Sequence, residues 1–405
     1  MNARGTAMTS RSSGILPRKL RGCINIADLD RLAKKTLPIS VYDHICGGAD
    51  DEITLSDNRQ AYRRFSLVPR CCADVDIQQV DMSVTVLGQN AEWPLLCAPW
   101  GGQAIVHRHG EVGMAHAAHD SGTLFCLSTF SNASIEEVAA AAPGPNLFQL
   151  HPSRSYTLMS ELMERARSAG YRALILTVDN PTHGNRERDL RNGLVWPPRL
   201  TPKGWWSIAK NPLWAFGAAR ANREYGNFSS HLKLPGQDTN WLMSQMLCPT
   251  NWQTVSRLVE QWKGPFAIKG IMSKSDALLA AQAGATAIIV SNQGGRHFDS
   301  APAALDCLKD VVDAVGGKVE VILDGGIRRG SDIVTALALG ARACMTARPF
   351  ALGLAAGGRL GAYRAIEILK SELRRDMTFL GLRSLSQITQ ECLLPRPFGA
   401  SINAA

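Results

Sequence analysis

Several short apolar segments of this 405-residue chain end in residues that could do chemistry. Lys269 closes the segment FAIKG, and a buried lysine is costly unless it faces an anion or an electron-rich ring. Further on, DGGIRRG (324–330) combines Arg328 with glycines that let backbone N–H groups approach an anion, and Arg348 closes the next segment. We interpret the glycines, Arg328 and Arg348 as a phosphate site. The alternatives are a tight turn with surface arginines and, for Lys269, a Schiff-base lysine.

Residues that can bind or react follow eight such segments. One polar segment end is usually a cap or a turn, but capping hardly explains eight in succession. The residues are Pro99, Trp100, Gly101, Ser128, Phe130, Gln149, His151, Thr177, Asp179, Arg186, Lys269, Gln293, Arg296, Asp324, Gly326, Arg328 and Arg348. Together they predict a single site built from the ends of several strands.

The apolar segments alternate with helical stretches, which predicts parallel strands covered by helices. They are PLLCAP (94–99), TLFCLST (123–129), NLFQL (146–150), ALILTV (173–178), FAIKG (266–270), AIIVSN (287–292), VEVILDG (319–325) and ACMTAR (343–348). Ser134 with Glu137 indicates a capping box at one helix start. Eight units predict an α/β fold of the (β/α)8 TIM-barrel class, whose active site lies at the carboxyl ends of the strands. An open doubly wound sheet is the alternative.

The predicted barrel covers residues 93–395, and the chain extends beyond it at both ends. Residues 1–22 are basic and polar and lack the apolar core of a signal peptide, so they predict a disordered arm. Residues 396–405 predict a C-terminal tail.

Two further regions stand apart from the barrel rhythm. Residues 23–92 predict a helical segment that caps the barrel, with a helix over 28–45 broken near Pro38 and mostly irregular structure with short strands over 52–90. The connection 180–250, after the fourth strand, is too long for an ordinary link and predicts a functional insert or lid. Within it, clustered tryptophans and flanking lysines at 202–216 suit a bilayer interface; a lid packed on the barrel or an oligomer contact is the alternative.

Composition excludes several classes of protein. With 20% charged and 45% hydrophobic residues, the chain is neither collagen-like nor wholly disordered. The net charge of +9 suits an anionic cofactor, substrate or membrane surface. We expect no nucleic-acid partner, because no cluster of five basic residues and no zinc-finger or RNA-binding signature occurs. The ten cysteines include no C-x-x-C pair and predict reduced thiols in a cytoplasmic protein, with no metal site.

From about residue 24 to residue 395 the chain resembles the FMN-dependent α-hydroxy acid oxidase and dehydrogenase family. The resemblance rests on the order and spacing of ADDEITLSDN, FQL, LTVD, GNRERD, KG, SN-GGR and ILDGGIRRG. It implies FMN as the cofactor, held by Pro99, Trp100, Gly101, Ser128, Gln149, Thr177, Lys269 and Asp324, with its phosphate against Gly326, Arg328 and Arg348.

The resemblance also implies roles at the substrate. Arg296 would clamp a substrate carboxylate, with Arg186 and Phe130 nearby. Lys269 would stabilise negative charge on the reduced flavin, and Asp179 would orient a catalytic histidine.

The departures from the family pattern lie in the middle of this site. The family motif SNHGGRQ reads SNQGGRH here, so Gln293 stands at the position of the catalytic base, and His44 and His151 replace two tyrosines. Glutamine cannot accept a proton near neutral pH, and losing a general base typically costs 10²–10⁴-fold in rate. We therefore predict a remodelled redox enzyme in which His151, His44 or Asp179 takes the proton. Ordinary 2-hydroxy acid oxidation and a catalytically altered or silent FMN-binding protein are the alternatives.

Partners are predicted less directly. The substrate is expected to be a small carboxylate, most simply a 2-hydroxy acid. The resemblance gives Gly101 a meaning, because dehydrogenases of the family often have glycine at this position and glycolate oxidase-like members have alanine. Together with the tryptophan-rich insert, Gly101 favours a membrane quinone or a carrier protein over O₂ as electron acceptor. A homo-oligomer, commonly a tetramer, is implied by the resemblance. We expect a cytoplasmic protein that contacts the inner face of the membrane peripherally.

Overall fold

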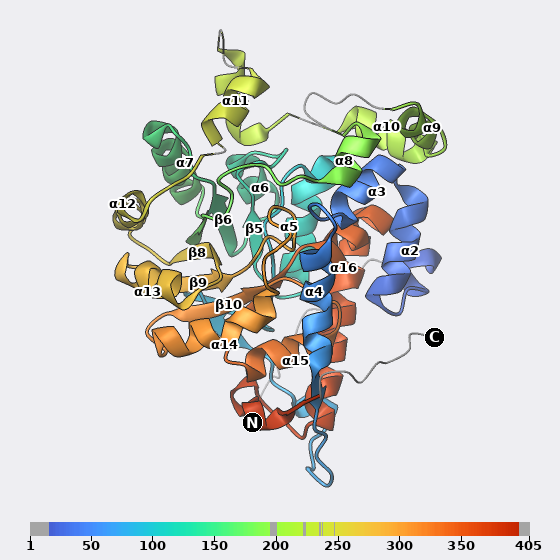
Figure 1. The fold of residues 1–405 in the computed structure, drawn as a ribbon. Helices are drawn as coiled ribbons and strands as arrows, with labels where there is room; N and C mark the ends of the chain where they lie inside the picture. The colour runs from blue at the N-terminus through green and yellow to red at the C-terminus, as the bar shows by residue number, and fades with distance from the viewer. Residues whose placement is uncertain are drawn as a thin grey trace, which may run out of the picture.

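Eight parallel strands close into a barrel in the order β10-β11-β4-β5-β6-β7-β8-β9. The computed structural model describes residues 16–194, 201–221, 224–234, 236, 238–246 and 248–396, and helices surround its strands (Figure 1). The strands are β4 (Leu95–Cys97), β5 (Phe125–Leu127), β6 (Asn146–Leu150), β7 (Ala173–Thr177), β8 (Phe266–Ile271), β9 (Ala287–Val290), β10 (Glu320–Asp324) and β11 (Ala343–Thr346). Each coincides with one predicted segment, so the barrel is confirmed and the open sheet is wrong.

Adjacent residues of a strand face two different apolar clusters. One cluster takes a side chain from every barrel strand and therefore fills the interior: Leu96, Cys126, Leu147, Ile175, Ala267, Ile289, Ile322 and Met345. Phe148 and Leu174, next to two of these, belong to the cluster under the helices. Side chains alternate across a strand and both faces are dry here, which explains why the strand sequences are almost wholly apolar.

A hairpin closes the end of the barrel where the strands begin. It consists of β2 (Val84–Val86) and β3 (Gln89–Ala91), and Val86 and Leu87 join the interior cluster. Leu87 N donates to Glu320 Oε2 over 2.8 Å at the start of β10. The interior is thus sealed at this end, so a site can open only at the other.

Helices form the outer layer. They are α5 (Gly110–Asp120), α6 (Ile135–Ala141), α7 (Tyr156–Ser168), α12 (Trp252–Trp262), α13 (Lys274–Gln282), α14 (Ala304–Val315), α15 (Gly330–Ala338) and α16 (Arg348–Phe379). The capping box of Ser134 and Glu137 is confirmed at the start of α6. Helix α16 breaks at Gly357 and Gly358, and Gly358 has φ +61°, a conformation that favours glycine.

Four N-terminal elements pack against α16 on one side of the barrel (Figure 1): α1 (Arg18–Arg21), α2 (Ile26–Thr36), α3 (Ile39–Cys46) and the 3₁₀ turn η2 (Ile77–Gln79). Between them in the chain lie α4 (Ile53–Gln60), the 3₁₀ turn η1 (Ala61–Arg64) and β1 (Phe65–Leu67). The last pairs with β12 (Leu393–Pro395). The predicted break near Pro38 is confirmed between α2 and α3.

Two predictions for the flanks need correction. Part of the predicted arm 1–22 is the helix α1, whose Leu20 is fully buried, while residues 1–15 lie outside the described ranges. The region 52–90 opens with helix α4 rather than irregular structure, because the side chain of Asp299 accepts hydrogen bonds from the first N–H groups of α4. Of the predicted tail 396–405, only residue 396 is described.

The insert 180–250 forms short helices. They are α8 (Glu187–Asn192), α9 (Pro202–Ala209), α10 (Pro212–Arg220), η4 (Gly226–Phe228), η5 (His231–Lys233) and α11 (Thr239–Met246). In the other loops lie η3 (Gln103–Ile105), η6 (Leu385–Gln387) and η7 (Gln390–Cys392). Residues 195–200, 222–223, 235, 237 and 247 fall outside the described ranges.

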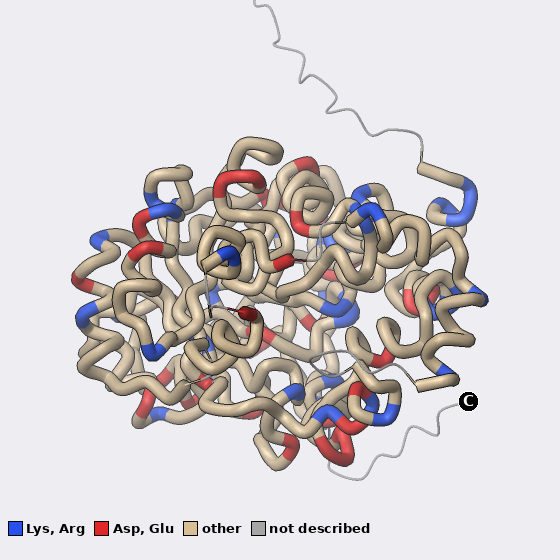
Figure 2. Tube along the Cα trace, turned by 90° about the horizontal axis from the view of Figure 1, so that it is seen from above, with Lys and Arg blue, Asp and Glu red and all other residues tan. Residues whose placement is uncertain are grey.

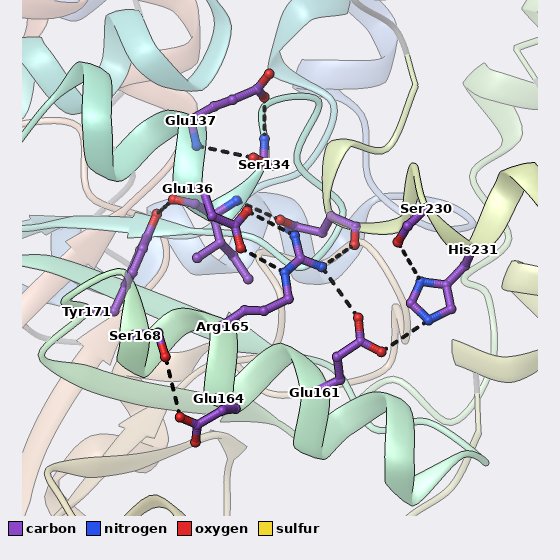
Figure 3. A network of polar contacts seen from close by, with 12 residues as sticks. Ser134, Glu136, Glu137, Glu161, Glu164, Arg165, Ser168, Tyr171, Ser230 and His231 are labelled. Atoms are coloured by element: carbon purple, nitrogen blue, oxygen red, sulfur yellow. Dashed lines mark hydrogen bonds and ion pairs between the residues drawn. The ribbon is translucent and has the colours of Figure 1, made fainter.

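Arg165 of α7 fastens part of this insert to the barrel (Figure 3). Its guanidinium donates to Glu136 of α6 over 2.8 and 3.0 Å and to the carbonyl oxygen of Asn227 over 2.7 Å. Glu161, one turn before Arg165, pairs with His231 Nε2 at 3.2 Å. The 3₁₀ turns η4 and η5 are therefore held against α6 and α7.

Charge and apolar surface are distributed differently. Basic and acidic residues both lie around the whole outline of the molecule (Figure 2), whereas Trp205, Trp206, Leu213 and Phe216 are 59–90% exposed on α9 and α10. Within the described part of the chain, no helix is long and apolar enough to cross a membrane. All ten cysteines are free thiols.

Candidate active site at the carboxyl end of the barrel

The ammonium group of Lys269, on β8, lies between side chains from the next two strands. Its Nζ is 2.8 Å from Asp324 Oδ2 and donates to Ser291 Oγ over 2.9 Å. Ser291 Oγ in turn donates to Asp324 Oδ2 over 2.8 Å. Lys269 is only 2% exposed, so a carboxylate rather than water compensates its charge. The ends of β8, β9 and β10 therefore meet, as predicted.

Gln293 and Asp179 face each other across the same opening. Gln293 Nε2 donates to Asp179 Oδ1 over 2.8 Å, and the backbone N–H of Gln293 donates to Ser291 Oγ over 3.1 Å. Burial raises the pKa of Asp179 above its ordinary value, although the charge of Lys269 and the hydrogen bond from Gln293 act in the opposite direction. The amide thus satisfies Asp179 without supplying a proton acceptor of its own.

Arg328 and Arg348 are half-buried at the ends of β10 and β11. Arg348 donates to the carbonyl oxygens of Ile45, Gly294 and Gly47 over 2.9–3.1 Å, and Arg328 donates to that of Ile327 over 2.7 Å. Burial, together with neighbouring arginines, lowers the pKa to about 10 for Arg328 and about 9 for Arg348. No carboxylate of the described residues lies within 4 Å of either guanidinium, so an anion would be stabilised between them.

A second cationic group surrounds His44 at the end of α3. His44 Nδ1 is 2.9 Å from Asp189 Oδ2, and Arg186 Nε lies 3.4 Å from the same oxygen. Arg296 donates to the carbonyl oxygens of His44 and Gly47 over 2.6 and 3.2 Å. Burial lowers the pKa of Arg296 to about 10, with Arg186 acting in the same direction. The positive charges of Arg296 and Arg186 fit a carboxylate ligand.

Gln149 and Thr177 continue the ring of polar side chains. Gln149 Nε2 donates to Thr177 Oγ1 over 2.7 Å, joining β6 to β7. At the end of β5, Ser128 Oγ accepts from the backbone N–H of Phe130 over 3.2 Å. The predicted strand-end residues Ser128, Gln149 and Thr177 therefore lie at the same carboxyl end of the barrel, which we call the barrel mouth.

His151 lies in an aromatic group. Its ring centroid is 5.2 Å from that of Phe130, which lies 5.6 Å from Tyr225 and 6.3 Å from Phe228 of the insert. Burial, with the nearby charges of His297 and Lys269, lowers the pKa of His151 to about 3. Its imidazole is thus neutral at physiological pH and has no carboxylate among the groups that shift it.

Pro99, Trp100 and Gly101 follow β4 and lead into η3. Gly101 lies against Phe130, because a Cβ added there would be 2.7 Å from the Phe130 carbonyl oxygen and 2.8 Å from its Cβ. Close packing against Phe130 is by itself a reason for glycine at position 101. Gly101 is therefore weaker evidence about the electron acceptor.

Several positioning residues were not predicted from the sequence. Asn58 of α4 exchanges two hydrogen bonds, 2.9 and 3.0 Å long, with Asn292 beside Gln293. A Cβ on Gly326 would lie 1.9 Å from the Asn58 carbonyl oxygen, so α4 and the glycine loop touch. Asn227 of the insert donates to the carbonyls of Ser128 and Thr129 over 3.3 and 3.0 Å. Asn58 and Asn292 lay in motifs that the sequence analysis had singled out, ADDEITLSDN and SN-GGR, whereas Asn227 did not.

These features define an FMN-dependent oxidoreductase of the 2-hydroxy acid type. Residues 33–395 match the family model described as FMN-dependent dehydrogenase, so the chain belongs to that family. It is 41% identical over 370 residues to an L-lactate oxidase of Nostoc sp., covering 90% of this chain and 96% of that one. It is 37% identical over 372 residues to the glycolate oxidase of Spinacia oleracea, covering 90% and 94%.

A solved structure shares the fold closely. It is described as the monotopic membrane protein (S)-mandelate dehydrogenase and superposes with a TM-score of 0.88 at 32% identity. The match covers 93% of this chain and all of that one. The barrel, the cofactor class and the reaction class predicted from the sequence are confirmed by these relatives and by the fold.

Proposed function

We propose that this protein oxidises a 2-hydroxy acid, or a closely related carboxylate, with FMN and with a rearranged proton acceptor. The observation that carries the proposal is the set of cationic side chains at one barrel mouth: Lys269, Arg296, Arg328 and Arg348. Such a concentration of positive charge requires anions, and FMN with a carboxylate substrate supplies two.

The residues present fit FMN. The half-buried guanidiniums of Arg328 and Arg348 have no carboxylate partner among the described residues and would hold the phosphate, with the Gly326 backbone beside them. Lys269 would lie at the electron-rich edge of the flavin ring, and Asp324 and Ser291 hold its ammonium group in place. Bound FMN supplies the acceptor for the hydride from the substrate carbon.

The other proposed cofactor contacts form the wall of the mouth. They are the backbone of Pro99, Trp100 and Gly101 and the side chains of Ser128, Gln149 and Thr177. The hydrogen bond between Gln149 and Thr177 fixes both side chains before a ligand arrives, which lowers the cost of ordering them on binding.

Substrate binding is assigned to Arg296 and Arg186. Arg296 would pair with the carboxylate in a forked arrangement, and Phe130 would contact the remainder of the substrate. Gln293 at the base position, held by Asp179, supports transfer of the proton to another group, for which Asp179, His151 and His44 are the candidates.

Anaerobic mixing of the FMN-loaded protein with lactate, glycolate, mandelate and larger aryl or alkyl 2-hydroxy acids tests the proposal. We expect at least one to bleach the visible absorbance of the flavin. If none does, the protein is better described by the second candidate, a silent or altered FMN-binding protein. Gln293 at the position of the catalytic base favours that second candidate, because glutamine cannot accept a proton near neutral pH.

We further propose contact with an anionic membrane surface through α9 and α10. Trp205, Trp206 and Leu213 are exposed there, Lys210 lies 5.1 Å from the Trp206 ring, and α9 also carries Lys203. Aromatic and basic residues in one surface suit the headgroup region, and one structural relative is described as monotopic. This contact supports a membrane quinone or carrier protein as electron acceptor, with O₂ as the alternative.

Two further expectations remain proposals. The chain is expected to form a homo-oligomer, as a tetramer, and to act on the cytoplasmic side of the membrane. Light scattering in solution tests the first, and fractionation of cells tests the second.

A further inference from the structure

A histidine–aspartate pair lies at the barrel mouth apart from the Gln293–Asp179 pair. His44 Nδ1 is 2.9 Å from Asp189 Oδ2. The two side chains come from α3 and α8, neither of which belongs to the barrel wall. A carboxylate bonded to one ring nitrogen of a histidine fixes the tautomer and leaves the other nitrogen as the acceptor.

The free nitrogen of this pair is available to a ligand. No hydrogen bond from the described residues reaches His44 Nε2, and the side chain is 31% exposed, whereas that of Asp189 is 7% exposed. Arg296, which we propose binds the substrate carboxylate, also donates a hydrogen bond to the backbone carbonyl oxygen of His44. A substrate held by Arg296 would lie beside His44.

We propose that His44 Nε2, supported by Asp189, is the proton acceptor of the reaction in place of residue 293. This inference rests on the proposed function. The hydroxyl proton of the 2-hydroxy acid passes to His44 Nε2, the C–H bond gives its hydrogen and electron pair to FMN, and the C–O bond becomes the carbonyl of a 2-oxo acid.

The two rival acceptors are less suited to this step. Burial would disfavour protonated His151, the ammonium of Lys269 would repel it, and no carboxylate of the described residues forms an ion pair with it. Burial raises the pKa of Asp179, but its carboxylate already accepts a hydrogen bond from Gln293 and the nearby ammonium of Lys269 favours its charged form. An imidazolium at His44 would instead form an ion pair with Asp189.

The charges around His44 determine how the rate should depend on pH. Burial and the positive charges of Arg296 and Arg186 lower the pKa of His44, and Asp189 acts in the opposite direction. The net shift is downward, so the imidazole is neutral and able to accept a proton at neutral pH. The rate should fall as the pH drops through the pKa of His44, because the protonated ring cannot accept the proton.

The first experiment measures flavin reduction by stopped flow in the FMN-loaded full chain, using the best 2-hydroxy acid found for the wild type. We expect His44→Gln to lower the rate constant 10²–10⁴-fold, with a much smaller change in substrate affinity, and to remove the acidic limb of the pH profile. Asp189→Asn should also slow reduction, because an amide stabilises an imidazolium less. His116→Gln, on α5 away from the mouth, is the matched control and should match the wild type.

The second experiment does not depend on turnover. Diethyl pyrocarbonate modifies neutral imidazole, and mass spectrometry locates the modified histidine. We expect modification of His44 at Nε2, lost on acidification and blocked by pyruvate, a product-like 2-oxo acid. Modification that is unaffected by pyruvate would contradict a position beside the substrate.

The outcomes separate this inference from the proposed function. If no 2-hydroxy acid reduces the wild-type flavin, both are wrong. If the wild-type flavin is reduced and His44→Gln retains the wild-type rate and pH profile, only the assignment of His44 as proton acceptor is wrong. Loss of activity in His151→Gln or Asp179→Asn, with His44→Gln unaffected, would assign the proton to that residue instead.

Discussion

The side-chain amide of Gln293 donates a hydrogen bond to Asp179 Oδ1 over 2.8 Å. An amide can satisfy this carboxylate but cannot itself accept a proton, so Gln293 cannot act as the general base. Gln293 has φ +55°, a left-handed conformation that few residue types tolerate well. The surrounding loop must therefore hold residue 293 in place whatever its side chain.

Gln293→His is the most informative single change at this position. Histidine is among the residues that accept a left-handed conformation, and Asp179 would orient its ring. We expect flavin reduction by lactate, glycolate or mandelate to rise severalfold rather than by the full ~10²–10⁴-fold of a missing base, because a second general base is added to His44. Stopped-flow reduction under anaerobic conditions measures the change. An unchanged rate would mean that the remainder of the site does not accept these substrates.

Arg328→Met tests the assignment of the phosphate site. Loss of one charged hydrogen-bonding group should weaken FMN binding roughly ten- to a hundredfold, which corresponds to about 1.5–3 kcal/mol. Riboflavin, which lacks the phosphate, should bind the variant and the wild type equally. Fluorescence titration of the apoprotein with both flavins makes the measurement.

The neighbouring residue provides the control for that experiment. Arg329 donates to Glu372 on α16 rather than facing the mouth, so Arg329→Met should leave FMN affinity unchanged. Equal weakening of FMN and riboflavin by Arg328→Met would show a general structural effect and not a phosphate contact.

The barrel could be predicted from the sequence because its strands are dry on both faces. Segments such as ALILTV carry no polar side chain until the strand ends, and Lys269, Asp179 and Arg348 mark those ends. In a closed parallel barrel all such ends lie at one mouth, so predicting the barrel also placed the site.

Contacts between distant segments could not be predicted in this way. Nothing in the spacing of His44 and Asp189 indicates that α3 and α8 meet, and the hydrogen bonds of Asn227 to the β5 loop depend on how the insert folds back. Helix α4 was missed because its N-terminal N–H groups are capped by Asp299, which is remote in sequence. Local periodicity carries no information about such partners.

The exposed apolar surface of α9 and α10 should bind anionic vesicles. We expect the full chain to co-sediment with vesicles containing phosphatidylserine, and Trp206→Ser combined with Leu213→Ser to abolish this, because aromatic and aliphatic burial drives interfacial binding. Phe379→Ser removes an equally exposed aromatic ring at the far end of α16 and should change nothing. Self-association through α9 and α10, with no vesicle binding, would indicate an oligomer contact instead.

The low pKa of His151 makes a specific contribution to stability. The unfolded chain protonates this histidine near 6.5 and the folded chain only near 3, so the unfolded state binds more protons between these values. This contribution is complete above pH 6.5 and is lost as the pH falls towards 3. His151→Gln should flatten the fall of the melting temperature over this range. An identical pH dependence in variant and wild type would show that the ring is not buried as described.

Lys269 and Asp324 should be interdependent for stability. Among the described residues, Lys269→Met leaves the poorly exposed carboxylate of Asp324 with Ser291 as its remaining partner, and breaking such a pair typically costs about 3–5 kcal/mol. Adding Asp324→Asn removes the uncompensated charge, so the double variant should regain much of this loss. The double variant should still lack the positive charge that favours the reduced flavin. Its flavin reduction potential should therefore be lower than that of the wild type, although its stability is largely regained.

Urea unfolding of the apoproteins measures the change in stability, and a potentiometric titration of the reconstituted double variant measures the change in reduction potential. Additive losses in the two single variants and the double variant would contradict direct coupling between the two side chains.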